Sequence, residues 1–458
     1  MTSLPREERL LTPVPALGIP ALTHQIQTAI DRMSSQGGGQ VTLGPGIWEI
    51  TTIRLRTGVT LHLELGAILQ AATDIALYPV IEGSADNKDQ SKFHLIHAEG
   101  CEDIALTGPG IIDGQDTAFW APCESEAQRP YGIFDYYVPG ERLSPLVQIV
   151  RCRRVRVEGV TIRRSPSWTL HLYDCDDVQV RQIRMRNHLL GPNTDGIGIN
   201  SCRDVIISGC DITGGDDSII VKATLPGKPC ERVIVSNCIA DTNCTAFGIG
   251  SETQGGIRDI SFTNCVSRRS LRIVKIQLWS TGWVENVIFS NIVGRTYPTE
   301  NVTCERPIYI DIQEFKKPGQ PLGRVRNVQF SNIVCTTRGR ILITAQDGAT
   351  VENITLRDIH LDIPEIEDPA EAVPKARSMQ LSNFSPQARV ARAAAVFDNV
   401  RDLRVQGLTL RWPEPASVPM HALWFRNVRA VIDAPFLTAS QPGVETRVLQ
   451  DSEVSFRA

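Results

Sequence analysis

Aromatic residues are scarce in this chain, its net charge is small, and it has no long apolar run. Aromatics make up only 6% of the 458 residues, whereas glycine and proline number 35 and 28. This richness in small and turn-forming residues favours β structure over helix. The formal net charge of -4 excludes the strongly basic surface that binds nucleic acid or acidic membranes, so we expect neither as a partner.

The N-terminal segment MTSLPREERLLTPVPALGIP lacks a basic region followed by an apolar run, which is the pattern of a secretory signal. No stretch is long and apolar enough to span a bilayer. We therefore expect a cytoplasmic protein, or a secreted one whose signal has been removed. The twelve cysteines fit the cytoplasm, because no Cys-x-x-Cys pair indicates a structural zinc site. We interpret them as reduced thiols in a core and expect no metal and no cofactor.

Eight segments share one apolar pattern, which indicates an internal repeat. Their first apolar residues recur every 23–28 residues, with one longer interval: Val155, Val178, Val205, Val233, Ile260, Val287, Val328 and Ile354. A second apolar column lies two residues further on, which is the alternation of a β-strand. A third column lies five residues on: Val160, Ile183, Cys210, Cys238, Cys265, Ile292, Ile333 and Ile359.

The odd step to the third column requires the chain to turn a corner. The residues at the corner are mostly types that tolerate the left-handed conformation: Gly159, Gln182, Gly209, Asn237, Asn264, Asn291, Asn332 and Asp358. A strand, a corner and another strand in each repeat predict an all-β fold, the right-handed parallel β-helix, in which stacked coils bury a common core. The cysteine column would then be interior packing.

We predict a single domain over residues 1–458. Residues 1–40 would form an N-terminal cap, because the segment Thr23–Met33 has helical apolar spacing and the first coil exposes strand edges that need covering. Residues 41–362 would form the main coils. Residues 363–458 would hold a long excursion rich in proline, alanine and charge, followed by the last coils.

Three acidic residues lie in an otherwise apolar part of the repeat. Asp195 and Asp217 are 22 residues apart (217 − 195), close to one coil, so they should be neighbours, with Asp216 beside them. Clustered carboxylates repel one another, and one of them is then held protonated beside ionised partners. Glycoside hydrolysis needs this arrangement of an acid and a base. Simple turn chemistry in the Gly-Gly-Asp-Asp segment and a Ca²⁺ site are the alternatives.

At these residues the sequence resembles glycoside hydrolase family 28, the polygalacturonase family of right-handed β-helices. The segments NTDG (193–196) and GDD (215–217) match two family signatures, with support from SPSWTLH, GPGIIDGQ and IGSE. The resemblance implies an inverting hydrolase in which Asp216 is the general acid. Asp195 and Asp217 would hold and deprotonate the attacking water, and Asn193 would help to fix the site.

The substrate-binding pattern of the family is altered. Thr245 stands where the family has a histidine, and Ile273 stands at the family's arginine position. Lys275 keeps the lysine position, and Arg272 comes one residue early, which in a regular strand places it on the opposite face unless a bulge intervenes. Phe315 fills a later tyrosine position. We expect Lys275, Arg272 and Thr245 to contact substrate.

Other candidates lie on loops. Trp279 would stack on a sugar ring or pack the coil edge, and Arg295 and Tyr297 would bind substrate on the same side as Lys275. The insertion from Pro122 to Pro145 carries four aromatic residues. As a lid it would block one end of a cleft and favour exo action, and an oligomer contact is the alternative.

These observations predict an inverting glycoside hydrolase that is exo-acting on pectin-derived, galacturonate-containing oligosaccharides. The alternatives are a β-helix transglycosylase, a lyase or hydrolase on a different glycan, and a non-catalytic carbohydrate-binding β-helix. A lyase usually needs a basic proton acceptor, and a binding protein has no reason to hold three repelling acids together. The sequence predicts an oligosaccharide partner and leaves the oligomeric state open.

Overall fold

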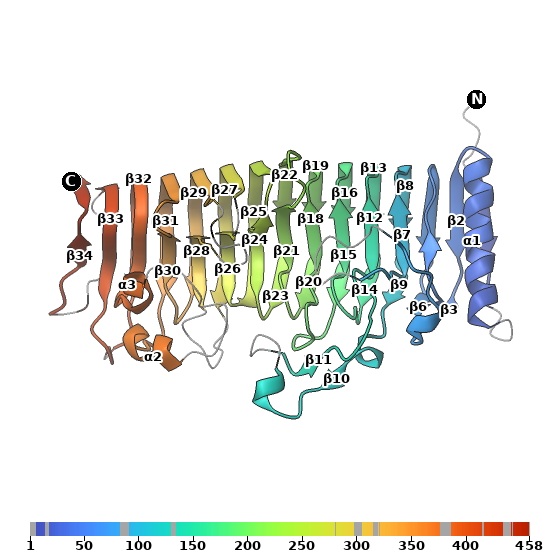
Figure 1. The fold of residues 1–458 in the computed structure, drawn as a ribbon, viewed down its shortest axis with the longest axis horizontal. Helices are drawn as coiled ribbons and strands as arrows, with labels where there is room; N and C mark the ends of the chain where they lie inside the picture. The colour runs from blue at the N-terminus through green and yellow to red at the C-terminus, as the bar shows by residue number, and fades with distance from the viewer. Residues whose placement is uncertain are drawn as a thin grey trace. The chain divides into compact units, whose positions relative to one another are not determined.

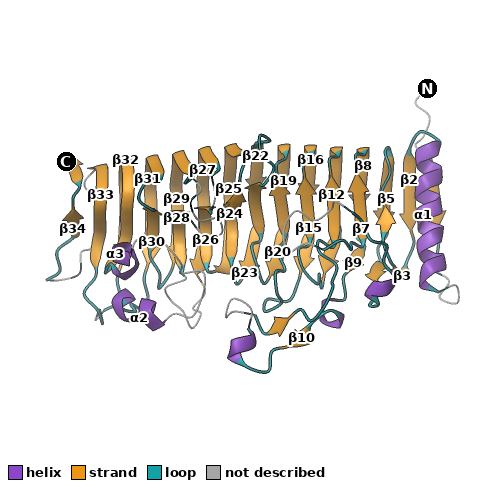
Figure 2. Cartoon of the chain, in the orientation of Figure 1, coloured by secondary structure: helices purple, strands orange, loops and turns teal. Residues whose placement is uncertain are grey.

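In the computed structural model the chain forms two compact units, Met1–Ser218 and Ile219–Ala458. The residues described are 6–13, 18–82, 91–129, 134–279, 281–296, 305–314, 319, 321–375, 386–414, 416–433, 441 and 443–457. Figures 1 and 2 show that strands dominate and helices are few. No helix within these residues is long and apolar enough to cross a membrane.

The first unit begins with helix α1 (Ile19–Ser35), which caps the first coil. Its buried residues recur at helical spacing, so they form one face: Leu22, Ile26, Ala29, Ile30 and Met33. This face packs against β2 (Gly39–Leu43) and β3 (Gly46–Ile50), and Figure 1 shows the helix beside β2. The predicted capping helix is confirmed, and it is longer than the segment with apolar spacing. The strand β1 (Glu7–Leu10) pairs with β2.

The coils of the first unit contain three strands each, which pair in parallel with the equivalent strands of the next coil. One ladder consists of β4 (Ile53–Arg54), β7 (Ile96–Glu99), β12 (Val147–Val150), β15 (Leu170–Tyr173) and β18 (Ile197–Asn200). A second ladder continues from β2 through β5 (Val59–Leu63), β8 (Glu102–Thr107), β13 (Arg153–Glu158), β16 (Asp176–Arg181) and β19 (Arg203–Ser208). The third continues from β3 through β6 (Ala67–Ala71), β9 (Ile111–Asp113), β14 (Thr161–Arg163), β17 (Arg184–Arg186) and β20 (Asp211–Gly214).

Short elements leave these coils. The insertion after β9 contains β10 (Ala121–Pro122) and β11 (Tyr136–Tyr137), which pair with each other in antiparallel orientation. The single-turn 3₁₀ helices are Ile75–Leu77, Asp116–Ala118 and Glu126–Gln128. The insertion therefore has its own small structure beside the coils.

The second unit is also a stack of parallel coils, and its strands are longer. One ladder consists of β21 (Ile219–Ala223), β24 (Thr245–Thr253), β26 (Arg272–Leu278), β28 (Arg306–Ile312) and β30 (Ile341–Ala345). The other consists of β22 (Cys230–Ser236), β25 (Gly256–Ser270), β27 (Trp283–Thr296), β29 (Arg324–Thr336) and β31 (Thr350–Asp362). The short strand β23 (Ile239–Thr242) pairs with the second half of β25.

The last strands of the second unit join both ladders, and they follow the excursion. The strands β32 (Ala393–Arg411) and β33 (His421–Asp433) run through both ladders, and β34 (Arg447–Gln450) and β35 (Glu453–Arg457) end them. The helices α2 (Pro369–Lys375) and α3 (Pro386–Val390) lie in the excursion between β31 and β32.

The corners predicted from the repeat are confirmed. All eight corner residues have positive φ, from 52° at Asn332 to 79° at Gly159. In the second unit, corner asparagines stack through their side chains, with Asn332 donating to Asn291 at 2.8 Å and Asn291 donating to Asn264 at 3.1 Å. Since asparagine tolerates this conformation and bonds to its own copy in the next coil, the corner column holds the coils in register.

The apolar columns form the core of each unit. Phe262, Phe289 and Phe330 stack with ring centroids 4.9 and 5.3 Å apart, and each is fully buried. Burial of each such ring contributes about 1.5–3 kcal/mol. The predicted cysteine column is likewise interior, because Cys210, Cys238 and Cys265 are each 1% exposed.

Candidate active site

The acidic residues of the first unit lie where two successive coils meet. Asp195 lies two residues before β18, and Asp217 lies three residues after β20. The Gly196 amide donates to the Asp217 carbonyl at 2.9 Å, and the Ile197 amide donates to the Ser218 carbonyl at 2.8 Å. These are the bonds of a parallel ladder in which Asp195 is opposite Asp217, so the two residues are one coil spacing apart, about 4.8 Å. The predicted register is confirmed.

Asp216 lies beside this pair. Its Oδ1 accepts a hydrogen bond of 2.8 Å from the Asp217 amide, and carboxylate oxygens of Asp216 and Asp217 lie within 4.8 Å of each other. Asp195 and Asp217 are each only 7% exposed, whereas Asp216 is half-buried. Carboxylates this close repel one another in a poorly hydrated setting, which favours protonation of one of them. The same pair of carboxylates also suits a cation with oxygen ligands.

The glycines around the acids allow the two loops to pack closely. A Cβ added to Gly214 would lie 2.5 Å from the Thr194 carbonyl, and one added to Gly215 would lie 2.5 Å from the Gly191 carbonyl. The Gly215 amide donates to Thr194 Oγ1 at 2.6 Å. The segments Asn-Thr-Asp-Gly and Gly-Gly-Asp-Asp therefore pack against each other through these glycines. An isolated turn would not need glycine at these positions.

Asn193 lies in the loop that directly precedes Asp195. It has φ of 56°, and its Oδ1 accepts a hydrogen bond of 3.0 Å from Arg142. Arg142 belongs to the insertion and is 8% exposed. Asn193 is thus close to the acids in the chain and held by the insertion, and its contact with substrate stays a prediction.

The insertion contributes an aromatic cluster that sequence analysis identified only in part. Tyr136 lies 5.5 Å from Trp120 and 5.1 Å from His188, measured between ring centroids. Phe134 is fully buried, and Tyr131 lies outside the described residues. His188 was not predicted, and its place five residues before Asn193 was the only signal. Figure 1 shows β10 and β11 standing apart from the coils.

The second unit brings together Arg272 and Thr245. Arg272 Nη1 lies 3.4 Å from Thr245 Oγ1 and 3.3 Å from Cys244 Sγ. Its guanidinium also lies over the Tyr309 ring, 5.8 Å from the centroid. Lys275 is opposite Tyr309 in the ladder and is 3% exposed. Arg272 is the first residue of β26 and lies at the corner, where the alternation of a regular strand does not apply. Its side chain therefore reaches Tyr309, the register partner of Lys275.

Further polar residues of this ladder were not predicted from the sequence. The fully buried Arg306 lies over the Tyr309 ring at 4.4 Å, and the Tyr309 hydroxyl lies 3.3 Å from Gln277 Nε2. Burial raises the pKa of the Asp311 carboxyl to about 6, although the Arg306 guanidinium opposes this shift. Tyr309 and Asp311 are the register partners of Lys275 and Gln277, but a separation of 34 residues (309 − 275) lies outside the repeat of 23–28, so the spacing did not predict them.

A buried ion pair near the start of the second unit was also not predicted. Lys222 Nζ lies 2.9 Å from Glu252 Oε2, and the two side chains are 11% and 25% exposed. Glu252 ends the segment Ile-Gly-Ser-Glu, which sequence analysis used only as a family signature. The pair joins β21 to β24, and a partly buried pair of this kind is costly to break from one side.

Trp279 and Arg295 are the remaining predicted residues that the structure describes. Trp279 follows β26 and is half-buried, with its backbone amide bonded to the Ser251 carbonyl at 3.1 Å. Arg295 is exposed on β27, which belongs to a different ladder from the strand that carries Lys275. Tyr297 and Phe315 lie outside the described residues. The contacts of Trp279, Arg295 and Tyr297 with substrate stay predictions.

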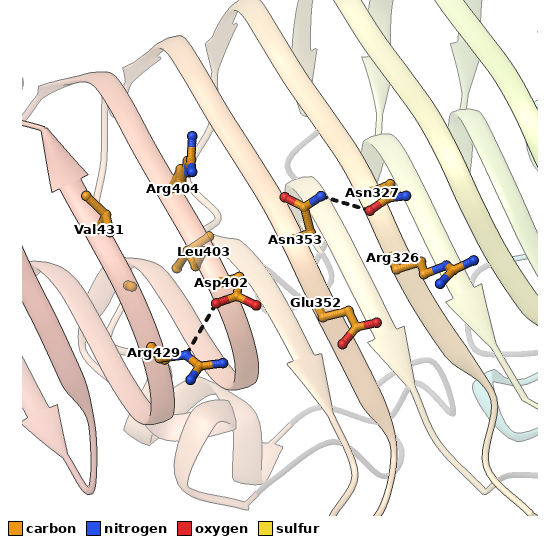
Figure 3. Close-up of a pocket in the computed structure, with 10 residues that line it drawn as sticks. Arg326, Asn327, Glu352, Asn353, Asp402, Leu403, Arg404, Arg429 and Val431 are labelled. Carbon is orange, nitrogen blue, oxygen red and sulfur yellow. Dashed lines mark hydrogen bonds and ion pairs between the residues drawn. The ribbon is translucent and has the colours of Figure 1, made fainter.

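A pocket in the second unit is a weaker candidate for a sugar-binding site than the acidic cluster. It has a volume of about 570 Å³ and is lined by ten residues, none of them aromatic. Figure 3 shows Arg429 facing Asp402, with Arg429 Nε 3.3 Å from Asp402 Oδ1. Asn353 and Asn327 in the same pocket bond to each other at 2.8 Å. These groups already satisfy one another, so the acidic cluster is the better candidate for chemistry.

Comparison with known proteins identifies relatives of this chain. The chain is 26% identical over 297 residues to a Vitis vinifera protein named Probable polygalacturonase, in a match covering 60% of this chain and 57% of that relative. It is 23% identical over 354 residues to Endo-polygalacturonase of Pectobacterium carotovorum subsp. carotovorum, with 74% and 84% covered. The chain thus spans little more than half the length of the grapevine relative.

The fold is similar to that of a hyperthermoactive exopolygalacturonase from Thermotoga maritima. The TM-score is 0.62 with 24% identity, and 78% of this chain and 87% of that one are covered, which shows a shared β-helical fold. The sequence profile of Glycosyl hydrolases family 28 matches residues 51–379, which include all three acids and most of the coils. The chain belongs to glycosyl hydrolases family 28.

Proposed function

We propose that this protein is an inverting glycoside hydrolase that removes units from the ends of galacturonate-containing oligosaccharides. The observation that carries the proposal is the ladder register that sets Asp195 opposite Asp217, with Asp216 adjacent. Membership of the family supports the hydrolytic reaction. The names of the grapevine and Pectobacterium relatives support a polygalacturonate-type substrate.

The exposure of the three acids suggests their roles. Asp216 is the most exposed and is suited to protonate the glycosidic oxygen as that bond breaks. Asp195 and Asp217 are buried and suited to hold a water and accept its proton as its oxygen bonds to the anomeric carbon. The oxygens of Asp216 and Asp217 are closer than the carboxyl separation usual in inverting enzymes, so the anomeric configuration of the first product is a decisive measurement.

A cationic group in the second unit supports an acidic substrate. Arg272 and Arg306 lie over the Tyr309 ring, and Lys275 is opposite Tyr309 in the ladder, with the acidic Asp311 two residues further along the strand. Positive charges of low exposure attract carboxylates more strongly than surface charges do, because water screens them less. These cations would bind the substrate carboxylate in place of the family's histidine and arginine, which this chain lacks at the matching positions.

Two features support action at chain ends. In the first unit, Tyr136 of the insertion and the preceding Trp120 pack on His188, next to the loop that carries the acid Asp195. In the second unit, Ala388 of α3 joins a buried cluster with Tyr309, Leu342 and Trp424. Part of α3 therefore covers the ladder at Tyr309.

The test is a product analysis on defined substrates. Wild-type protein is incubated with oligogalacturonides of several lengths, rhamnogalacturonan fragments and neutral oligosaccharides, with and without a chelator, and the products are followed by mass spectrometry. Monomer as the first product indicates exo action, and a mixture of lengths indicates endo action. Proton NMR of the fresh product gives the anomer. An unsaturated product would indicate a lyase, binding without products would indicate a carbohydrate-binding protein, and loss of activity with chelator would indicate a cation.

A further inference from the structure

The insertion of the first unit is tied to the catalytic loop through one buried arginine. Arg142 Nη1 donates to the carbonyls of Pro166 and Pro192, at 3.0 and 2.8 Å, and Nη2 donates to Asn193 Oδ1 at 3.0 Å. These acceptors belong to two successive coils, and all three are neutral oxygens. Arginine suits this role because its planar fork presents several donors in fixed directions.

An aromatic ring that directly precedes the insertion also contacts this loop. Trp120 Nε1 donates to the Pro166 carbonyl at 2.8 Å, the oxygen that Arg142 also contacts. A Cβ at Gly191 would overlap the Trp120 ring, so the ring lies directly on this glycine. The Gly191 carbonyl in turn lies against Gly215, the residue before Asp216. Contacts thus run from the insertion to both acid-bearing loops.

The loop between these contacts is not stabilised by regular strand pairing. It runs from His188 to Thr194, between β17 and β18, and Asn193 has a left-handed backbone. Thr194 Oγ1 donates to the His188 carbonyl at 3.2 Å and accepts from the Gly215 amide. Asp195 follows directly, so its position depends on how firmly this loop is held.

We propose that Arg142 is a positioning residue for the hydrolytic reaction: it anchors the loop before Asp195 to the insertion and thereby holds Asp195 in register with Asp217. This inference rests on the proposed function. Arg142 contacts the loop through Asn193 and Pro192, so its loss would displace a reacting group without removing a substrate contact. A displacement of about 1 Å at a catalytic group costs on the order of 100-fold in rate.

The experiment compares Arg142→Ala, Arg142→Lys and the control Arg156→Ala with wild type. Arg156 is exposed on β13 and pairs only with Glu158 among the contacts that the structure gives it, at 3.1 Å. We expect Arg142→Ala to lower kcat roughly 100-fold, with KM changed by less than about threefold. Arg142→Lys should be intermediate, because one ammonium cannot bond to three separated acceptors. Guanidinium at low millimolar concentration should restore part of the kcat of Arg142→Ala and none in the control.

Hydrogen exchange provides a readout that does not depend on the substrate. Amides of Gly191–Ile197 should exchange faster in Arg142→Ala than in wild type and be unchanged in Arg156→Ala. If wild type hydrolyses none of the substrates, the proposed function fails, and the exchange result alone decides whether Arg142 holds this loop. If wild type is active and Arg142→Ala keeps its kcat, the inference is overturned while the proposed function stands. Unchanged exchange in Arg142→Ala would also overturn it.

Discussion

Replacement of Asp216 by asparagine should abolish turnover without destabilising the protein. The amide keeps an oxygen that can accept the hydrogen bond from the Asp217 backbone, now 2.8 Å long, so the local turn is preserved. What is lost is the acid proton and the negative charge. Removal of a general acid typically lowers the rate by about 10²–10⁴-fold.

The stability effect follows from the distance between the carboxylates. Carboxylate oxygens of Asp216 and Asp217 lie within 4.8 Å of each other, and for two unit charges at that limit an effective dielectric of about 20 gives a repulsion of about 3.5 kcal/mol. Asp216 is half-exposed, so solvent screening reduces this to about 1–2 kcal/mol. Relief of this repulsion at neutral pH should raise Tm by about 1–4 °C.

The assay combines reducing-sugar release with thermal unfolding of the same preparation. Asp177→Asn is the matched control, because Asp177 is exposed in the same unit and its φ of 55° suits asparagine equally well. The control should keep its activity and its Tm. Near-wild-type turnover in Asp216→Asn would remove Asp216 from the role of acid. A Tm several degrees below wild type would show that repulsion between the carboxylates of Asp216 and Asp217 does not destabilise the folded protein.

Three further predictions test other parts of the structure. Gly215→Ala should lower stability by about 1–3 kcal/mol and reduce kcat, because the new Cβ meets the Gly191 carbonyl; Gly140→Ala, which has open space around it and no positive φ, controls for the methyl group in denaturant unfolding. Burial raises the pKa of Asp311 to about 6, so the folded protein binds this proton more tightly than the unfolded chain; stability should fall as the pH rises from about 4 to about 6, and urea unfolding across this range should show a smaller decline in Asp311→Asn. Lys275→Ala should raise KM for acidic oligosaccharides roughly ten- to hundredfold, in line with about 1.5–3 kcal/mol for a charged hydrogen bond, and an equal loss on neutral oligosaccharides would argue against a carboxylate contact.

The local sequence accounts for most of the coil architecture. Apolar residues at positions 0, +2 and +5 and a turn-forming residue at +4 predicted the corner, and Asn237, Asn264 and Asn291 all have left-handed backbones there. The spacing of 22 residues placed Asp195 opposite Asp217. These predictions succeeded because stacked coils convert a distance along the chain into a fixed position in the ladder.

The third strand of each coil in the first unit was less evident from the pattern. Strands such as β14 and β17 have only three residues each, too few to display alternation. Arg272 illustrates a related limit. Its position one residue before the family's arginine predicted the opposite face, yet it starts β26 at a corner and reaches Thr245 and Tyr309. Alternation holds only within a strand, so it does not predict where a corner residue points.

The sequence by itself determined the repeat, the corners and the register of the acids, because each depends on neighbours within one coil or on a constant coil length. Only the tertiary structure decided which residues surround and hold that site. Arg142 donates a hydrogen bond to Asn193, and Trp120 lies on Gly191. These contacts join residues 51 and 71 apart in the chain (193 − 142 and 191 − 120), and the coil repeat does not predict them. An insertion leaves the repeat, so its contacts follow from how its own side chains pack against the coils.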